Sequence, residues 1–319
     1  MTTLRMRVEQ IDALTPTIRR LLLIAADRQP LPAFSAGAHI GLQVPIEGRT
    51  QRRAYSLVNA PADTGHYEIA VQLEAASSGG SRWVHQLGTG AELDVTPPRN
   101  DFALDPAARS ALLIAGGIGI TPILAMARAL NAAGTQYELH YAAREAAMMA
   151  YRDEVAALPG ATCWLDGGDP RQGIPLAATI GAPQPDRHLY VCGPRPLIDA
   201  VLSHAKALGW PDAQVHSELF AANQQGADDN TDTAFDVLLK TSGLTLSVPA
   251  GKTILDVMID AGLDPMFDCR RGDCGVCTTR VLDGTPDHRD ICLSSADHAR
   301  GDFCPCVSRA ASPRLVLDL

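Results

Sequence analysis

The sequence of 319 residues predicts a multidomain protein: an antiparallel β-barrel, then an α/β domain with a parallel sheet, then a small α+β domain. Short segments of alternating polarity, separated by turn residues, fill residues 6–102, which is typical of a barrel or sandwich. After Pro106, strand-like and helix-like segments alternate, which indicates a parallel sheet covered by helices. Six of the eight cysteines lie beyond residue 268, so their chemistry belongs to a terminal domain.

The first domain is expected over residues 1–104. Apolar and polar residues alternate in short segments there, and residues that favour turns bound each segment. One helix is expected to begin at Ser81, directly after Gly79 and Gly80, and to end near Leu87. The expected strands are residues 7–11, 20–24, 39–44, 67–72 and 92–96.

The second domain is expected over residues 105–222. Ser110 opens eighteen residues without a charge, a length that could span a membrane. Gly117, Gly119 and Pro122 interrupt this stretch, however, and predict a strand, a turn and a helix in series. The expected strands are residues 111–115, 137–143, 189–192 and 215–219, and the expected helices are residues 122–132, 146–157 and 196–207.

Residues 223–233 (NQQGADDNTDT) are polar and acidic and lack apolar periodicity, which predicts an interdomain linker. The third domain is then expected over residues 234–319. Apolar alternation at residues 244–248 indicates a strand, and apolar residues recur at helical spacing over residues 254–261.

The charge balance limits the classes of partner. A formal net charge of −9 and the lack of any Lys and Arg cluster argue against binding to nucleic acid or to an anionic membrane. The amino terminus has Arg5 and Arg7 but no apolar core of signal-peptide length, so a cytoplasmic location is expected. In that reducing compartment, eight cysteines indicate metal or redox chemistry rather than disulfides.

Cys269, Cys274 and Cys277 form a C-x4-C-x2-C motif with further cysteines downstream, the spacing of a plant-type [2Fe-2S] cluster. Gly272 and Gly275 permit the tight loop that directs three thiolates at one inorganic core. Structural zinc is the alternative, but its usual pattern is two CxxC pairs, whereas this motif has one. The spacing therefore predicts an iron–sulfur cluster.

The fourth cluster ligand is open among Cys292, Cys304 and Cys306, which all lie downstream. Cys306 is favoured because it opens the segment CVSRA, after which residues 311–319 (ASPRLVLDL) indicate a closing strand. Cys292 and Cys304 are interpreted as small buried residues.

With this ending the chain resembles the phthalate dioxygenase reductase family. Members end in a ferredoxin domain of β-grasp fold, with a cysteine directly before a VSRA-like segment and a final LVLDL. They also carry an ADHRD-like stretch between the third and fourth ligands, and residues 286–290 here are PDHRD. The resemblance runs from end to end in the order flavin, nicotinamide and ferredoxin domain, and it departs from the family pattern at Cys292 and Cys304.

Residues 53–57 (RAYSL) match the RxYS motif of the ferredoxin-reductase superfamily, to which this family belongs. Tyr55 offers an aromatic face to a flavin ring, Ser56 a hydroxyl to its N5 edge, and Arg53 a cation to a phosphate. Ala54 completes the extended segment that presents them. A plain edge strand is the alternative interpretation of the same residues.

Gly79 and Gly80 precede the expected helix and Ser81 begins it, so free N–H groups and the positive end of the helix dipole would face an anion such as the flavin phosphate. The resemblance implies FMN as the flavin, because superfamily members that use FAD need additional contacts for adenosine. It also implies that FMN is lined by this turn and by the strand residues Ala70, Val71 and Gln72. The aromatic residue that it places near the flavin ring is Phe220.

Residues 116–122 (GGIGITP) form a bare turn between a strand and a helix at the edge of a parallel sheet, where such folds bind ligands. The third glycine of a GxGxxG fingerprint is absent, but the pattern resembles the GGxGxTP of the superfamily. Gly117, Gly119 and Thr121 are therefore predicted to contact a nicotinamide nucleotide. Thr121 and Pro122 also suit a helix cap and a first helical position, an alternative that needs no ligand.

Cys192, Gly193 and Pro194 end another expected strand and resemble the superfamily's CGP motif beside the nicotinamide. A buried strand-end cysteine is the alternative, but two such turns where the sheet opens favour one shared dinucleotide cleft. The negative charge of residues 165–169 (LDGGD) would disfavour the 2′-phosphate of NADPH if this segment faces the adenosine ribose. Charge alone does not decide between NADH and NADPH.

The resemblance implies the reductase component of an oxygenase. NADH would deliver a hydride to FMN, and electrons would pass singly to the cluster and on to a separate Rieske-type non-haem iron oxygenase, for aromatic ring hydroxylation or O-demethylation. Ser56 is the one side chain with an expected catalytic role. Two alternatives are a reductase that serves a haem protein and a redox sensor that uses the cluster without turnover.

Overall fold

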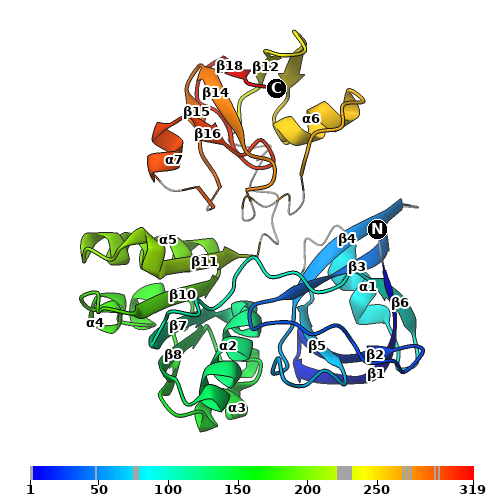
Figure 1. Cartoon of the computed structure of the whole chain (residues 1–319), viewed down its shortest axis with the longest axis vertical. Helices are drawn as coiled ribbons and strands as arrows, with labels where there is room; N and C mark the ends of the chain where they lie inside the picture. The colour runs from blue at the N-terminus through cyan, green and yellow to red at the C-terminus, as the bar shows by residue number, and fades with distance from the viewer. Residues whose placement is uncertain are drawn as a thin grey trace. The chain divides into compact units, whose positions relative to one another are not determined.

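The computed structural model describes residues 3–46, 49–74, 79–220, 232–267, 270, 272, 275–290, 292–293 and 295–319. The chain forms two compact units, Met1–Glu218 and Leu219–Leu319 (Figure 1). Within the described ranges, no helix is both long and apolar enough to cross a membrane. The limits expected for three separate domains stay predictions, and the expected linker lies outside the described residues except for Asp232 and Thr233.

Six antiparallel strands form the first sheet, in the order β4-β3-β6-β1-β2-β5. The N–H of Val58, just beyond β4, donates to the carbonyl of Glu68 in β5 at 2.8 Å. The two edge strands therefore meet, and the sheet curls into the expected barrel (Figure 1). The strands are β1 (Leu4–Thr15), β2 (Ile18–Ala25), β3 (His39–Ile46), β4 (Arg49–Ser56), β5 (Tyr67–Gln72) and β6 (Glu92–Val95).

Alternate side chains of these strands fill the barrel. Met6, Val8, Leu21 and Leu23 are completely buried, and each buried aliphatic side chain of this size contributes about 1.5–3 kcal/mol. Helix α1 (Gly80–Gln86) packs against β3 and β5. It follows Gly79, whose φ of 113° favours glycine, so the expected helix is confirmed within one residue at each end.

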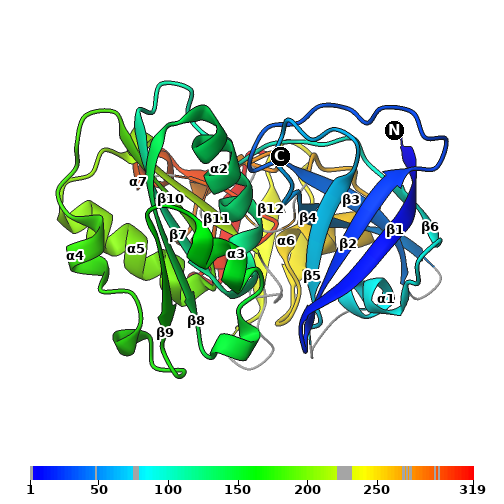
Figure 2. The same ribbon diagram turned by 90° about the horizontal axis from the view of Figure 1, so that it is seen from below.

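The second sheet of this unit has the order β11-β10-β7-β8-β9, with β10, β7, β8 and β9 parallel (Figure 2). Strands β7 and β10 are buried along nearly their whole length, as expected of central strands in a parallel sheet. Helix α2 packs against β7, β8 and β10, and α5 packs against β10. The elements are β7 (Ser110–Gly116), α2 (Ile120–Ala133), β8 (Gln136–Ala143), α3 (Arg152–Ala157), β9 (Ala161–Leu165), α4 (Leu176–Ile180), β10 (Arg187–Gly193), α5 (Arg195–Ala207) and β11 (Val215–Leu219).

One local expectation for this domain is wrong, and so is one of the alternative interpretations. Residues 146–157 do not form one helix, because a short 3-10 turn (Ala146–Met148) and α3 are separated at Tyr151, which has a positive φ of 56°. Thr121 does not cap α2, since Gly119 holds the N-cap position and the Thr121 hydroxyl donates to the Ile118 carbonyl at 3.0 Å. Strand β9 and helix α4 were not expected from the sequence.

The second unit contains a mixed sheet in the order β13-β12-β18-β14-β16, in which only β12 and β18 pair in parallel. Helix α6 packs against β13 and starts with a reciprocal capping box between Thr253 and Asp256. This arrangement confirms the expected α+β architecture. The elements are β12 (Phe235–Leu239), β13 (Thr245–Val248), α6 (Ile254–Asp260), β14 (Thr279–Asp283), β15 (Pro286–Asp287), α7 (Ser295–Ala299), β16 (Asp302–Phe303), β17 (Arg309–Ala310) and β18 (Arg314–Leu317).

A buried ion pair connects the start of this unit to β17. The Arg309 side chain is 2% exposed, and its Nε lies 3.1 Å from Oδ2 of Asp232, which is 1% exposed. The remaining guanidinium nitrogens donate to the backbone carbonyls of Thr233, Pro249 and Lys252. These bonds compensate the cost of removing both charges from water.

We expect Arg309→Ala to destabilise the second unit by about 3 kcal/mol, because it leaves the Asp232 carboxylate buried with a smaller set of partners. Hydrogen exchange of the β12 and β18 amides during urea titration measures this loss. Arg314→Ala, at an exposed position of β18, is the matched control and should stay within about 0.5 kcal/mol of the parent. Equal stability of the two variants would contradict the assignment.

Candidate functional site

The predicted flavin motif forms the end of β4, where Ser56 pairs with His39 and Tyr55 with Ile40 across β3. Ser56 is 4% exposed, and Tyr55 packs against the barrel core. Burial raises the pKa of the Tyr55 hydroxyl to about 12. Tyr55 is therefore a neutral aromatic group at physiological pH, which suits ring packing rather than proton transfer.

The turn before α1 lies against Arg53. A Cβ atom at Gly80 would lie 3.0 Å from Cγ and 3.1 Å from Nε of Arg53, so the missing side chain allows this close approach. The Ser81 hydroxyl accepts a hydrogen bond from the N–H of Glu74 at 3.1 Å. The structure thus brings Arg53 together with the first turn of α1, the combination of cation and N–H groups that an anion site needs.

The other predicted flavin residues lie on β5 and in the second unit. Ala70 and Val71 are buried and Gln72 is half-buried, on the strand that meets β4 where the barrel closes. His85 of α1 forms a hydrogen bond with the Val71 carbonyl at 2.9 Å, which ties the helix to this strand. Phe220 is half-buried but belongs to the second unit, so its place beside the flavin stays a prediction.

The two predicted nicotinamide turns touch each other. Strands β7 and β10 are parallel neighbours, with Ala115 opposite Cys192, so both turns leave the same edge of the sheet. A Cβ atom at Gly119 would lie 2.3 Å from the carbonyl oxygen of Cys192 and 2.7 Å from the nitrogen of Gly193. Glycine at position 119 is thus what allows the two backbones to approach this closely.

The members of these turns differ in their access to solvent. Thr121 and Cys192 are buried, and the Thr121 hydroxyl is used within the first turn of α2. Gly117 is half-buried, with open space where a Cβ atom would lie, and Pro194 is exposed. A nucleotide at this edge would therefore contact Gly117 and Pro194, whereas Gly119 sets the spacing of the two turns.

One buried carboxylate joins the barrel to α2. Glu68 in β5 is 5% exposed, accepts a hydrogen bond from the Tyr151 hydroxyl at 2.7 Å, and lies 3.6 Å from Nη1 of Arg128 in α2. Arg128 also donates to the Val58 carbonyl at 2.6 Å and pairs through two nitrogens with Glu154. Burial and the adjacent carboxylate raise the pKa of Tyr151, so its hydroxyl stays a donor. The strand with the predicted flavin residues is thus held against the helix that follows the nicotinamide turn.

In the second unit, Cys277 and Cys306 are 8% and 3% exposed and belong to one buried cluster with Cys304. Cys269 and Cys274 lie outside the described residues. Gly272 has a φ of 77°, and a Cβ atom there would lie 2.6 Å from Cγ2 of Val307. Glycine therefore lets the predicted cluster loop pack against the segment that carries Cys306.

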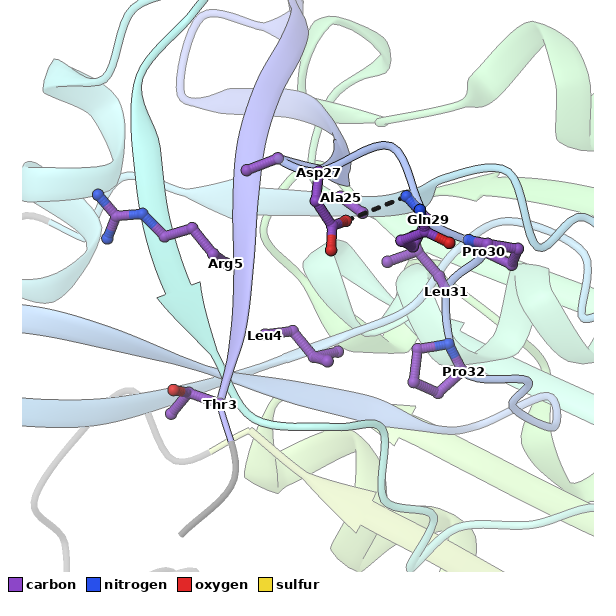
Figure 3. A pocket seen from close by; sticks show the side chains of 10 residues that line it. Thr3, Leu4, Arg5, Ala25, Asp27, Gln29, Pro30, Leu31 and Pro32 are labelled. Atoms are coloured by element: carbon purple, nitrogen blue, oxygen red, sulfur yellow. Dashed lines mark hydrogen bonds between the residues drawn. The ribbon is translucent and has the colours of Figure 1, made fainter.

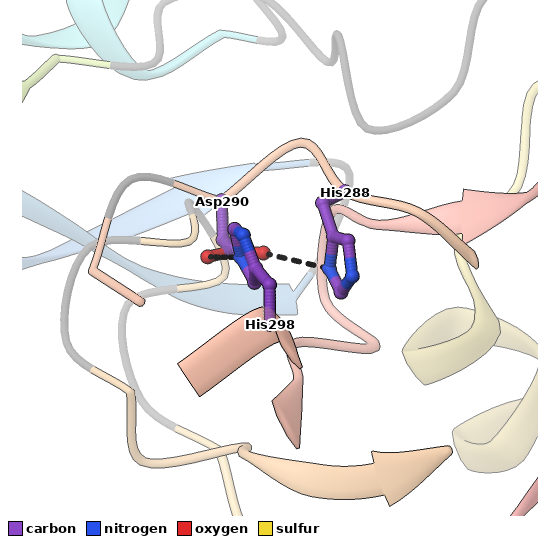
Figure 4. A group of neighbouring side chains, drawn as sticks. All are labelled: His288, Asp290 and His298. Atoms are coloured by element: carbon purple, nitrogen blue, oxygen red, sulfur yellow. Dashed lines mark hydrogen bonds and ion pairs between the residues drawn. The ribbon is translucent and has the colours of Figure 1, made fainter. Parts of the chain in front are cut away.

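Asp290 connects this segment to the PDHRD stretch. Its side chain is completely buried and accepts a hydrogen bond from Oγ of Ser308 at 3.0 Å. It accepts another from Nε2 of His298, also at 3.0 Å (Figure 4). The Ser308 hydroxyl in turn accepts from the N–H of Arg289 at 3.0 Å. The two stretches that carry the family resemblance therefore bind each other directly beside Cys306.

His288, Asp290 and His298 lie close enough together to be considered as a metal site. The two imidazole rings are stacked, however, with centroids 3.8 Å apart and planes 20° apart (Figure 4). Nitrogen lone pairs lie in the ring plane, so rings stacked face to face cannot both direct one at a single ion. Burial also lowers the pKa of His288. Asp290 and His298 form a hydrogen-bonded pair that supports the cysteine segment through Ser308, and the His288 ring is stacked on His298.

The barrel also has a surface pocket, formed by β1, the end of β2 and the segment after it (Figure 3). Its lining consists of residues 3–5, 25–27 and 29–32, with the apolar side chains of Leu4 and Leu31 among them. The predicted flavin residues lie instead on β4, β5 and α1, so this pocket is separate from the candidate site.

Three family models match successive parts of the chain. They are an oxidoreductase FAD-binding domain over residues 6–103, an oxidoreductase NAD-binding domain over residues 113–162 and a 2Fe-2S iron-sulfur cluster binding domain over residues 237–311. Vanillate O-demethylase oxidoreductase of Pseudomonas sp. (strain HR199) is 42% identical over 304 residues, which cover 94% of each chain.

Two further proteins match along nearly the whole chain. The heme-dependent oxidative N-demethylase beta subunit of Ectopseudomonas mendocina (strain ymp) is 40% identical and covers 100% of this chain and 99% of its own. The solved phthalate dioxygenase reductase is 36% identical, with a TM-score of 0.75 over 99% of this chain and 98% of its own. The chain belongs to the phthalate dioxygenase reductase family.

Membership in the phthalate dioxygenase reductase family confirms the predicted fold class and an oxidoreductase with flavin, nicotinamide and iron–sulfur domains. It also bears out the predicted cofactors, FMN, NADH and a [2Fe-2S] cluster, as the set for this family. The individual contacts of each site residue stay predictions. Sequence reasoning missed Glu68, Arg128 and Tyr151, because they lie in ordinary strand and helix segments without a motif.

The contact between the nicotinamide turns gives a test. We expect Gly119→Ala to raise the KM for NADH at least tenfold, since its Cβ atom would collide with the Cys192 carbonyl and force the turns apart. Flavin content should be unchanged, because the flavin motif lies on the barrel. Gly134→Ala, at the end of α2 and outside the two nicotinamide turns, is the matched control, with open space at its Cβ position and only the cost of its φ of 67°, about 1 kcal/mol. A larger effect at position 134 than at 119 would contradict this account.

Proposed function

We propose that this chain is the reductase component of a Rieske-type oxygenase, supplying electrons from NADH, through FMN and a [2Fe-2S] cluster, to a separate oxygenase that hydroxylates an aromatic ring or removes an O-methyl group. The similarity to vanillate O-demethylase oxidoreductase along 94% of both chains supports this. The observation that carries the proposal is the connection through Glu68, because it holds the predicted flavin strand and the predicted nicotinamide turn within one compact unit.

When bound, FMN supplies the conversion between the two electrons of a hydride and the single electrons that an iron–sulfur cluster accepts. The protein's part is then placement. Arg53 and the turn at Gly80 would bind the flavin phosphate, and Tyr55 would pack against the ring as a neutral group. Ser56, which is 4% exposed at the end of β4, would hold a hydroxyl at the reacting edge.

We propose Cys269, Cys274, Cys277 and Cys306 as the cluster ligands. Cys277 and Cys306 lie in one buried cluster, which also contains Cys304. In the turn at residues 304–308 the N–H groups of Val307 and Ser308 both donate to the Cys304 carbonyl, so Cys306 lies at the tip of a fixed backbone loop, which supports its choice as the fourth ligand.

A second candidate function is a reductase for a haem protein. The 40% identity to the beta subunit of a heme-dependent oxidative N-demethylase favours it, and the same hydride-to-single-electron path would serve either acceptor. Reduction rates with a purified Rieske oxygenase and with a purified haem N-demethylase subunit, each in excess, would separate the two.

We further propose a cytoplasmic location, where the NADH pool and reduced thiols are found. We also propose the domain limits 1–104, 105–222 and 234–319.

A visible absorption spectrum before and after anaerobic NADH tests the proposal, with the released flavin identified by chromatography. Flavin bands over a broad iron–sulfur shoulder, both bleached by NADH, and release of FMN are the expected result. Flavin without the shoulder, in protein that contains zinc but no iron, would overturn the cluster assignment.

Removing a cluster ligand should separate the two stages of electron transfer. We expect Cys277→Ser to abolish reduction of the acceptor protein, while flavin reduction by NADH keeps its parent rate because the predicted flavin and nicotinamide residues, apart from Phe220, lie in the other compact unit. Stopped-flow absorbance measures both rates. Cys163→Ser in β9 is the control for loss of a thiol. Loss of flavin reduction in Cys277→Ser would show that the units do not act independently.

Ser56→Ala tests the one proposed catalytic side chain. We expect flavin reduction to slow by roughly tenfold to a hundredfold, while the free energy of FMN binding changes by less than about 1 kcal/mol. Stopped-flow reduction and flavin titration give the two quantities. Ser203→Ala, at an exposed position of α5, is the matched control. If the rate of flavin reduction and the affinity for FMN fall by the same factor, Ser56 binds the flavin and has no catalytic role.

A further inference from the structure

Two thiols of the second unit have no role in the proposed electron path. Cys292 and Cys304 are the two cysteines of this unit outside the proposed ligand set, and the structure places their Sγ atoms 3.6 Å apart. We propose that these two residues form a modification site, in which a low-molecular-weight disulfide converts the pair to an intramolecular disulfide. The cross-link acts as a redox-controlled restraint on the segments that hold the cluster.

Cys292 lies against the predicted cluster loop. Its backbone N–H donates to the Gly272 carbonyl at 3.1 Å, and its Sγ is 3.8 Å from the position of a Cβ atom at Gly275. Cys292 is half-buried whereas Cys304 is completely buried, so Cys292 is the more exposed thiol of the pair and the one that an external disulfide would meet first. Cys292 is also fixed to the loop that contains the first three predicted ligands.

Cys304 lies on the other segment that holds the cluster. It is completely buried, and its carbonyl accepts from Val307 and Ser308 in the turn that carries Cys306. Its Sγ also lies 3.7 Å from Oγ1 of Thr278, next to the predicted ligand Cys277. A bond from Cys292 to Cys304 would thus connect the cluster loop to the Cys306 turn.

The separation suits bond formation. A disulfide has a sulfur–sulfur length of about 2.05 Å, and two sulfurs already in van der Waals contact can reach it by small side-chain adjustments. The residues between the two cysteines form α7 and β16, so the bond would close one short local loop. Cys163, in β9 of the other compact unit, has no place in this pair.

The oxidation balances with one external disulfide. The Cys292 sulfur loses its proton and attacks one sulfur of oxidised glutathione, releasing one glutathione thiol and forming a mixed disulfide. The Cys304 sulfur then attacks the Cys292 sulfur and displaces the second glutathione. Two protein thiols are oxidised, the small disulfide is reduced to two thiols, and the two protons leave with these products.

The consequence for the cluster rests on the proposed function. Release of a cluster requires its ligand segments to separate, and a covalent link between the Cys292 and Cys304 segments restricts that opening. Oxidised protein should therefore lose its cluster more slowly than reduced protein. The modification would act when the thiol pool becomes oxidised, which is also when an exposed cluster is most easily destroyed.

The experiment treats purified holoprotein with oxidised glutathione under anaerobic conditions, blocks remaining thiols by alkylation and identifies cross-linked peptides by mass spectrometry. The expected product joins Cys292 to Cys304, with two hydrogens lost and the cluster spectrum retained, while Cys163 is alkylated or carries glutathione. Alkylation of both thiols in protein with an intact cluster would overturn the proposal. So would cross-links confined to the predicted ligand cysteines, accompanied by cluster loss.

Cluster release into an iron chelator tests the restraint. Oxidised parent protein should lose its absorbance roughly tenfold more slowly than reduced protein, whereas Cys292→Ser and Cys304→Ser should show no difference between the two treatments. Cys163→Ser should behave as the parent. Equal release rates from cross-linked and reduced parent protein would refute the restraint. Untreated protein without iron or cluster absorbance would instead contradict the proposed function, whatever the state of the two thiols.

Discussion

The first compact unit depends on one buried carboxylate. The Glu68 carboxylate is buried on the barrel strand β5, and two groups from the parallel-sheet domain compensate it: the Tyr151 hydroxyl donates a hydrogen bond, and the Arg128 guanidinium forms an ion pair. A hydrogen bond to a charged group of this kind contributes about 1.5–3 kcal/mol, and the carboxylate would be left uncompensated if the barrel and α2 separated. Hydride transfer requires the reacting atoms to lie within about 3.5 Å of each other, so a fixed relation between the two predicted cofactor elements is what the chemistry needs.

In the second unit, the segments by which the family is recognised act as structural supports. The Asp290 carboxylate binds the Ser308 hydroxyl and His298, and the Arg309 guanidinium pairs with Asp232 and three backbone carbonyls. Each is a buried charge that requires its partner, so each fixes the turn at Cys306 from a different side. The PDHRD and CVSRA stretches therefore position a thiolate, and neither has to take part in redox chemistry to be needed.

Local signals in the sequence predicted the elements that depend on local interactions. Strand β5 has the expected bounds, because apolar alternation and flanking turn residues both mark it, and the glycines before Ser81 mark the start of α1. Elements shaped by distant contacts were missed. Tyr151 interrupts the expected helix over residues 146–157 with a positive φ, and its hydroxyl bonds to Glu68, 83 residues earlier in the chain. The C-x4-C-x2-C spacing predicted the cluster without tertiary information, whereas the spacing left the fourth ligand open and the choice of Cys306 came from the segment that follows it.

The division into two compact units follows the two kinds of electron transfer in the proposed function. A hydride moves as a nucleus with its electrons, so flavin and nicotinamide need atomic contact. Their predicted residues, apart from Phe220, lie in one unit held by Glu68 and by the backbone contact at Gly119. Single electrons can cross a gap between cofactors without such contact, and the cysteines predicted to hold the one-electron centre lie in the other unit. The cluster unit can therefore carry its own stabilising pairs, Asp290 with Ser308 and Arg309 with Asp232, independently of the hydride site. For the same reason, a cross-link between Cys292 and Cys304 would alter cluster retention without disturbing the reaction of NADH with the flavin.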